Sequence, residues 1–295
     1  MSDSKAIHQL NKFVMSFLGG LLNFLSNSYI IFKFIGNTAG KEYGIGHLQK
    51  ARLTIRVIQN RRKSRSLSSW QQHILLIEEI FLVPKSLRGE VVECGCFDGS
   101  STVSLSLACA LTHRGLIVCD SFEGLPRVKE DEKYDIQAHS RDYYAWEEGD
   151  FSLDHGLDGV KKNVETFGNI GICKFVKGYF KDTLKDIPTD SIVFIFEDVV
   201  LTSSVEDCLH YLWPRLQNGC KFYSHEPWSI NVVSLFFDKV WWKNNLKMEP
   251  PGFWGSGYGL GAGLRPSFMG YAKKFDPHEI KEQGTRIVHN GLKMT

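Results

Sequence analysis

The sequence predicts an α/β protein in which a mostly parallel sheet carries helices on both faces. Short apolar runs alternate with amphipathic stretches, which is the pattern of strand–helix units. The composition, with 43% apolar and 23% charged residues, is ordinary for a folded globular protein. A length of 295 residues allows one large domain with an appendage and a full-sized core.

The regular pattern begins near residue 67 and places each expected element. Strands are expected at residues 90–95, 115–120, 174–178, 191–198, 220–226 and 267–274. Helices are expected at residues 69–84, 100–114, 203–216 and 230–242. Ligands of such sheets bind beyond the carboxyl ends of the strands, so the functional residues should lie where each strand stops.

The remaining segments define the expected domain organisation. Residues 1–66 are predicted to be a helical N-terminal appendage, and residues 67–275 the main domain. The main domain would carry a lid at 123–156 and a glycine-rich loop at 250–266, either substrate-facing or a surface hairpin, before a polar tail at 276–295. Polar residues interrupt the apolar stretch 13–36, which favours packing on the core or in a homodimer over membrane contact.

Charge and cysteine content narrow the function classes. A formal net charge of +2 indicates no bias toward nucleic acid, and the basic run 61–65 is expected to connect helices rather than bind phosphate. The seven cysteines include no CxxC pair and no spacing typical of zinc. Buried, reduced thiols in a cytoplasmic protein are therefore expected.

The glycine turn after the first strand indicates a ligand. Glu93 precedes Gly95 and Gly99, where its carboxylate would repel a pyrophosphate and attract an ammonium group. This arrangement favours S-adenosylmethionine over NAD, although an acid that caps nearby amides remains an alternative. Asp120 follows at the ~20-residue distance at which an acid commonly holds a ribose diol, and Phe122 is placed to lie against adenine.

Four motifs resemble the macrocin/mycinamicin (TylF-type) family of sugar O-methyltransferases. They read VVECGCFDGSS, CDSFEGLP, FVKGYFKDTL and LHYLWPRLQNG, and the similarity covers roughly residues 70–245. The resemblance implies a Rossmann-like class I methyltransferase fold with a seven-stranded sheet. It also implies that S-adenosylmethionine is bound by residues of the strand ends and turns. These are Glu93, Gly95, Gly99, Ser100, Asp120, Ser121, Phe122, Gly178, Tyr179 and Asp182. For Tyr179 and the neighbouring Phe180, ordinary core packing is the alternative.

The resemblance further implies a magnesium ion, which would lower the pKa of a sugar hydroxyl and fix its position. In this sequence Asp198 matches the first family aspartate, and the Asp-Asp pair falls on His225 and Glu226. Val200 stands where the family has another acid. A weakened magnesium site, a different divalent ion and metal-free catalysis by His225 stay open, as does a non-catalytic polar strand end. We favour an ion held by Asp198 and Glu226.

The sequence therefore predicts an O-methyltransferase that acts on a glycosylated or polyhydroxylated small molecule in natural product biosynthesis. Acceptor contacts are expected from aromatic and polar residues of the lid, namely His139, Tyr143, Tyr144 and Trp146, with His155 as another candidate base. A nicotinamide-dependent oxidoreductase and a non-catalytic S-adenosylmethionine-binding descendant of the fold are the alternatives.

Overall fold

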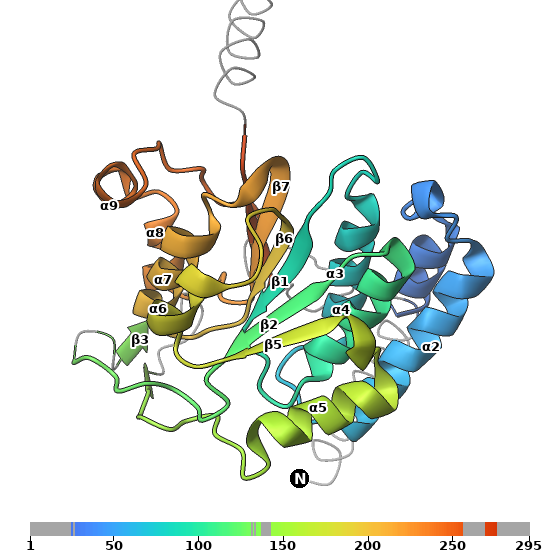
Figure 1. The fold of residues 1–295 in the computed structure, drawn as a ribbon, viewed down its shortest axis with the longest axis horizontal. Helices are drawn as coiled ribbons and strands as arrows, with labels where there is room; N and C mark the ends of the chain where they lie inside the picture. Colours follow the sequence, from blue (N-terminus) through green and yellow to red (C-terminus); the bar gives the residue numbers. More distant parts are fainter. Residues whose placement is uncertain are drawn as a thin grey trace, which may run out of the picture.

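The computed structural model of the protein describes residues 25, 27–130, 132, 134–136, 143–255 and 269–275, with only the backbone of 134–136, 143 and 144. Within these residues a six-stranded sheet has the order β5-β2-β1-β6-β7-β8 (Figure 1). The strands are β1 (Glu90–Cys94), β2 (Leu116–Asp120), β5 (Cys173–Lys177), β6 (Ile192–Glu197), β7 (Leu216–Ser224) and β8 (Gly270–Lys273). The first five run parallel, and β8 pairs antiparallel with β7 at the edge.

The strand order creates a crevice at the centre of the sheet. The chain adds β2 and β5 on one side of β1 and then crosses to β6 on the other side. The ends of β1 and β6 remain close there, since the Asp198 amide donates to the Cys94 carbonyl at 2.9 Å. Such a switch in strand order is where ligands of open α/β sheets bind.

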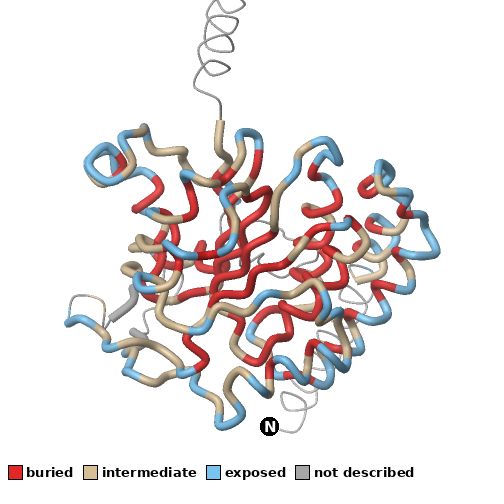
Figure 2. The backbone as a smooth tube through the Cα atoms, in the orientation of Figure 1, coloured by how far each residue is buried: buried red, intermediate tan, exposed pale blue. Residues whose placement is uncertain are grey.

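The core lies along the central strands and explains why they form. Residues of β1 from Val91 onward and all of β6 are buried, and β2 is buried up to Cys119 (Figure 2). Strands covered by helices on both faces require continuous apolar runs rather than alternation, as these sequences provide.

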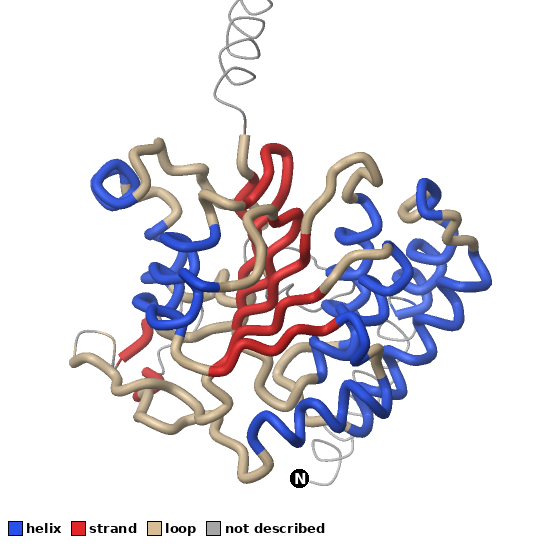
Figure 3. The backbone as a smooth tube through the Cα atoms, viewed as in Figure 1, coloured by secondary structure: helices blue, strands red, loops and turns tan. Residues whose placement is uncertain are grey.

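Helices α2–α5 pack on one face of the sheet and α6–α9 lie on the other side (Figures 1 and 3). The first group comprises α2 (His47–Lys63), α3 (Trp70–Leu82), α4 (Ser100–Thr112) and α5 (Gly156–Phe167). The second comprises α6 (Phe180–Thr183), α7 (Thr202–Leu212), α8 (Ile230–Leu235) and α9 (Lys239–Asn245). Short 3-10 helices are η1 (Lys41–Tyr43), η2 (Ile170–Ile172) and η3 (Leu184–Asp186).

The strand number and one helix differ from the sequence prediction. The described residues form six strands, so the seventh strand stays a prediction. The single helix expected at 230–242 is wrong, because the chain leaves the helix after Leu235 and starts α9 at Lys239. The Asp238 carboxylate accepts from the amides of Val240 and Trp241, both at 2.9 Å, and so caps the new helix.

The described part of the N-terminal segment packs against the main domain. Residues 27–36 are helical, and the Phe34 ring stacks on Phe81 of α3 with centroids 6.1 Å apart. Asn60 of α2 donates to the Ser100 carbonyl at 2.9 Å and so holds the start of α4. The predicted boundary at residue 66 between the appendage and the main domain stays a prediction. No helix among the described residues combines the length and hydropathy needed to cross a bilayer.

The expected lid contains an antiparallel pair that the sequence did not indicate, β3 (Tyr134–Ile136) and β4 (Tyr143–Ala145). Next to it the Glu132 carboxylate accepts from the Ser203 hydroxyl at 2.9 Å, which ties the lid to the start of α7. His139, the tail 276–295 and most of the glycine-rich loop 250–266 lie outside the described residues. All seven cysteines are unpaired, and six of them are buried.

Candidate functional site

A cavity of about 590 Å³ lies beyond the carboxyl ends of the parallel strands. Its wall brings together most of the residues that the sequence proposed for ligand binding and catalysis. These are Gly95, Ser100, Asp120, Ser121, Phe122, Tyr179, Asp182, Asp198, His225 and Glu226. Glu93, Gly99 and Gly178 are not part of the wall.

Gly95 allows the ends of β1 and β6 to approach each other. Its φ is +82°, and a Cβ atom at this position would collide with the Asp198 carbonyl oxygen. Gly99, with φ +78°, occupies the N-cap of α4, where no side chain caps the helix. The turn therefore presents the open N-terminus of α4 beside Ser100 at the cavity, an arrangement that favours a negatively charged group.

Glu93 lies behind the cavity wall rather than in it. Its side chain is fully buried, and neither carboxyl oxygen has a hydrogen-bond partner of normal geometry within the described part of the chain. Burial raises the pKa of Glu93 to about 8, although the nearby hydroxyls of Ser101 and Thr102 lower it somewhat. At neutral pH the acid is therefore mostly protonated, and its direct contact with an ammonium group stays a prediction.

Asp120 is held by the backbone at the end of β2. One carboxylate oxygen accepts from the Cys96 amide and the other from the Phe122 amide, each at 2.7 Å. These bonds join the glycine turn to the start of the lid, and they fix Phe122 in the left-handed region at φ +56°. Each oxygen keeps a second lone pair for a ligand hydroxyl.

The segment after β5 borders the same part of the cavity. Gly178 donates its amide to the Asp120 carbonyl at 3.0 Å and has φ +140°. Tyr179 and Asp182 line the wall, and Phe180 both lines it and packs against the core. Core packing of this aromatic segment and a place beside a ligand are therefore compatible.

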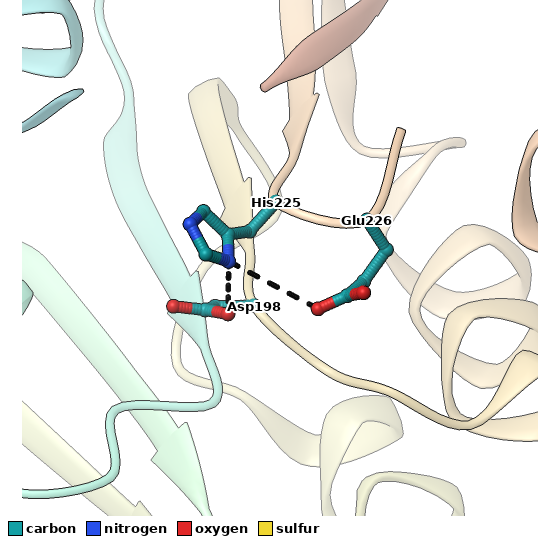
Figure 4. A group of neighbouring side chains, drawn as sticks. All are labelled: Asp198, His225 and Glu226. Carbon is teal, nitrogen blue, oxygen red and sulfur yellow. Dashed lines mark ion pairs between the residues drawn. The ribbon is translucent and has the colours of Figure 1, made fainter. Parts of the chain in front are cut away.

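Three side chains meet at the other end of the cavity, from the ends of β6 and β7 (Figure 4). The His225 Nδ1 atom lies 3.0 Å from the Asp198 Oδ1 atom and 3.9 Å from the Glu226 Oε1 atom. One potential ligand atom from each of Asp198, His225 and Glu226 falls within 4.8 Å of the others. We call these residues the trio. Two carboxylates and an imidazole form a donor set that suits a divalent cation.

Backbone and side-chain bonds position the trio. The His225 amide donates to the Glu197 carbonyl at 2.9 Å, and the Glu226 amide donates to the Ser224 hydroxyl at 3.1 Å. The Glu197 carboxyl is fully buried beneath them and accepts from the Val199 amide at 2.9 Å. Burial raises the pKa of Glu197 to about 8.

Burial and the neighbouring Asp198 carboxylate shift the pKa of the His225 imidazole in opposite directions. Burial lowers its pKa, but the Asp198 carboxylate and its hydrogen bond outweigh burial and leave the pKa above the usual value. On its other side, the Nε2 atom lies 3.3 Å from the side-chain nitrogen of Gln72 in α3. An amide N–H group facing Nε2 opposes a proton there, because two donors would meet.

Several wall residues were not found by sequence reasoning. The segment 65–68, between α2 and α3, forms part of the wall, and Gln72 contacts His225 from the same side. No motif in the sequence marks these positions, because their role depends on how α3 packs against the sheet. Trp228, two residues after Glu226, also lines the cavity, and its nearness to the trio in sequence was the available signal.

The lid contributes part of the wall. Trp146 lines the cavity, whereas the side chains of Tyr143 and Tyr144 are not among those described. His155 is not in the wall, since its Nε2 atom pairs with the Asp98 carboxylate at 2.9 Å. Asp98 also accepts from the Arg65 amide at 2.9 Å. These bonds fasten the glycine turn to α5 and to the segment 65–68.

With this geometry in place, comparison with known proteins assigns the family. The macrocin O-methyltransferase (TylF) family model matches residues 72–223. The chain belongs to this family. A curated relative, 8-demethyl-8-(2,3-dimethoxy-alpha-L-rhamnosyl)-tetracenomycin-C 4'-O-methyltransferase of Streptomyces olivaceus, is 34% identical over 135 residues, which are 44% of this chain and 50% of the relative.

Two further relatives extend the comparison. The mycinamicin III 3''-O-methyltransferase of Micromonospora griseorubida is 27% identical over 136 residues, which cover 44% of this chain and 52% of the relative. The chain thus spans about half the length of these curated relatives. The crystal structure of the calicheamicin methyltransferase CalS11 superposes with a TM-score of 0.50 at 15% identity, over 77% of this chain and 93% of that chain, and shows the same fold.

Proposed function

We propose that this protein is an S-adenosylmethionine-dependent O-methyltransferase that acts on a hydroxyl of a sugar or a polyhydroxylated small molecule. Its family membership and the names of its relatives support methyl transfer to a glycosylated product. The observation that carries the proposal is that one cavity is lined both by the glycine turn with Asp120 and by the trio. A donor held at the turn would present its methyl group to an acceptor held at the trio.

The cavity fits S-adenosylmethionine in size and in charge. Its volume of about 590 Å³ falls within the range of about 300–1,000 Å³ that is common for ligand pockets. The described wall residues include six carboxyl groups and four arginine or lysine side chains. This excess of acidic groups favours a cationic donor over a diphosphate. The acids are Asp120, Asp182, Asp198, Glu206, Asp207 and Glu226.

Each part of the donor finds suitable groups in the wall. The remaining lone pairs of Asp120 would accept from the ribose hydroxyls, and Phe122 and Tyr179 offer aromatic surface to the adenine. The open N-terminus of α4, with Ser100 and Ser101 in the wall, would receive the carboxylate of the methionine part. Ser66 and Ser68 border the cavity and can add hydroxyl donors.

The transfer itself requires an acceptor oxygen aligned with the methyl group and relieved of its proton. S-adenosylmethionine supplies the electrophilic methyl group, and alignment within the cavity supplies much of the rate. Asp198 is the most exposed member of the trio, with 24% of its side chain accessible against 10% for His225 and 3% for Glu226. We therefore infer that Asp198 accepts the proton of the bound hydroxyl.

A divalent cation would be held by Asp198 and Glu226, whose oxygens are the ligands that hard cations prefer. There it would lower the pKa of the acceptor hydroxyl and orient it. Metal assistance is a proposal for this chain. His225 stands where the family has the first aspartate of an Asp-Asp pair, so the metal-ligand donor set of this chain differs from the one that the resemblance implies.

Binding and transfer are measured separately. We expect calorimetry to show binding of S-adenosylhomocysteine, the demethylated product, and no competition by NADH. Transfer is then assayed by mass spectrometry with a panel of rhamnosides and other deoxysugar glycosides. Binding of NADH instead would support an oxidoreductase. Binding of S-adenosylhomocysteine without transfer to any acceptor in the panel would support a non-catalytic descendant, for which the altered trio is the motivating observation.

Assembly and location are also proposals. The exposed side chains of Leu25, Tyr29 and Phe32 follow one face of the N-terminal helix, and a second copy of the chain would cover them. The unpaired thiols are compatible with a cytoplasmic location, where the environment is reducing. Light scattering during size-exclusion chromatography tests the dimer directly.

A further inference from the structure

Gln72 of α3 makes two hydrogen bonds that together determine which ring nitrogen of His225 carries the proton. Gln72 is the third residue of α3 and closes a capping box with Ser69. Its Oε1 atom accepts from the Ser69 amide at 2.6 Å, and its Nε2 atom lies 3.3 Å from the His225 Nε2 atom. Gln72 is only 9% exposed as a residue, so few other arrangements are open to its side chain.

The orientation of the Gln72 amide follows from the capping box. A backbone N–H can only donate, so the atom that faces the Ser69 amide must be the oxygen. The NH₂ group is thereby aimed at His225, and an amide nitrogen has no lone pair to offer. His225 Nε2 must therefore be the acceptor, without a proton of its own.

The proton of the neutral imidazole is then on Nδ1. This atom lies 3.0 Å from the Asp198 Oδ1 atom, which accepts the hydrogen bond. The Nδ1 lone pair is consumed by the N–H bond and is not available to a cation between Asp198 and Glu226. We propose that Gln72 is a positioning residue, which holds His225 as a hydrogen-bond donor to Asp198 and keeps it out of the coordination shell of any cation.

This inference rests on the proposed function for its catalytic meaning, since Asp198 is the inferred proton acceptor. His225 uses one lone pair of the Asp198 Oδ1 atom, so the other Asp198 oxygen is the one best placed for the acceptor hydroxyl or for a cation. The trio then offers a cation oxygen ligands only, as the hard ions Mg²⁺ and Mn²⁺ prefer. The histidine at the position of a family aspartate thus acts through Asp198 rather than as a ligand.

Gln49 shows that a capping box does not require the second contact. It caps α2 in the same way, with its Oε1 atom accepting from the Gly46 amide at 2.9 Å, but it is exposed and has no histidine partner among the described residues. Gln49→Glu is therefore a matched control for Gln72→Glu. Both changes keep an oxygen for the cap, and only the second places a new acceptor against His225.

The decisive measurement is the tautomer of His225, read by long-range ¹H–¹⁵N correlation NMR of the metal-free protein at an alkaline pH at which the imidazole is neutral. Its signal is assigned by its loss in His225→Asn. We expect the proton on Nδ1 in the wild type and in Gln49→Glu. In Gln72→Glu we expect a proton on Nε2, because a carboxylate oxygen there accepts it, while Asp198 still accepts from Nδ1. A wild-type proton on Nε2, or an unchanged tautomer in Gln72→Glu, would overturn the proposal.

Metal binding gives an independent readout, with Mn²⁺ as the probe. Pulsed electron paramagnetic resonance should show no coupling to a directly bound nitrogen in the wild type and a clear coupling in Gln72→Glu. A carboxylate partner strengthens a ligating histidine, so Mn²⁺ affinity should rise by about tenfold in that variant. Nitrogen coupling in the wild type would contradict the proposal. Failure to bind S-adenosylhomocysteine would remove the proposed function but would leave the tautomer result intact.

Discussion

The two ends of the cavity are built in different ways. At the glycine-turn end, Asp120 is fixed by the amides of Cys96 and Phe122, which are 24 and 2 residues away in the sequence. At the trio end, His225 is fixed by the side chains of Asp198 and Gln72, and Gln72 is 153 residues away. The first end depends on backbone geometry that two short motifs, one after β1 and one after β2, encode. The second depends on the packing of α3 against the sheet.

This contrast predicts that binding and turnover can be separated by mutation at the trio. Asp198→Asn removes the inferred proton acceptor and keeps the shape of the side chain. We expect turnover to fall by about 10²–10⁴-fold, the usual contribution of a general base, while S-adenosylhomocysteine affinity is unchanged in calorimetry. Asp190→Asn, at an exposed position before β6, is the control and should be neutral. Equal loss of binding and turnover would show that the two ends are not independent.

Gly95 joins the two ends, so its replacement should damage both. In Gly95→Ala the new Cβ would collide with the Asp198 carbonyl oxygen and would force β1 and β6 apart. We expect a loss of about 2–4 kcal/mol in the free energy of unfolding, measured with urea. Cofactor binding and turnover should fall together.

Gly219→Ala is the matched control for this steric effect. Gly219 has φ +83°, nearly the same as Gly95, but a Cβ added there would meet no atom of the described residues within 4 Å. Only the backbone cost of a left-handed residue, about 1–2 kcal/mol, should appear there. If the two variants lost equal stability, the close approach of β1 to β6 would not be the reason for glycine at position 95.

Glu93 lies behind the glycine-turn end, and its buried carboxyl gives the stability a pH dependence. Its folded-state pKa of about 8 is above the usual 4.5, so the folded protein retains a proton that the unfolded chain has released. Stability from this group is therefore full below about pH 4.5 and is lost as the pH rises to 8. Between pH 5.5 and 8 the loss should reach at most about 3 kcal/mol.

Glu93→Gln removes the titrating proton and should flatten this part of the profile in urea unfolding. Glu197 has a similarly raised pKa, so part of the slope should remain in the variant. A profile that is identical in the variant and the wild type would show that Glu93 does not hold its proton in the folded state.

The smallest effect is expected for a substitution of Asp120, which tests whether the glycine-turn end serves binding alone. Asp120→Asn replaces one of two accepting oxygens by an NH₂ group that faces a backbone amide. We expect S-adenosylhomocysteine affinity to fall by about 10–100-fold, since a lost charged hydrogen bond costs about 1.5–3 kcal/mol. Turnover at saturating donor should stay within a few-fold of the wild type. A larger effect on saturated turnover than on binding would place Asp120 in the chemistry.

The sequence predicted the central strands and the glycine turn because both follow from local patterns. The apolar runs of β1, β2 and β6 appear where expected, and Gly95 has the positive φ that a tight turn requires. The break between α8 and α9 was missed, because the Asp238 cap competes with an otherwise continuous apolar pattern. The wall segment 65–68 was missed, because nothing local distinguishes a cavity wall from a connection between helices.

The amino-acid sequence by itself determined the order of the strands' apolar runs, the acids at their ends and the family motifs. Only the tertiary structure decided which of those acids reach the cavity, leaving Glu93 buried behind it and Asp198 partly exposed in its wall. It also brought Gln72 to His225. The physical reason is range: dihedral preferences and hydrophobic periodicity act over a few residues, whereas the protonation and partners of a buried side chain depend on every element packed around it.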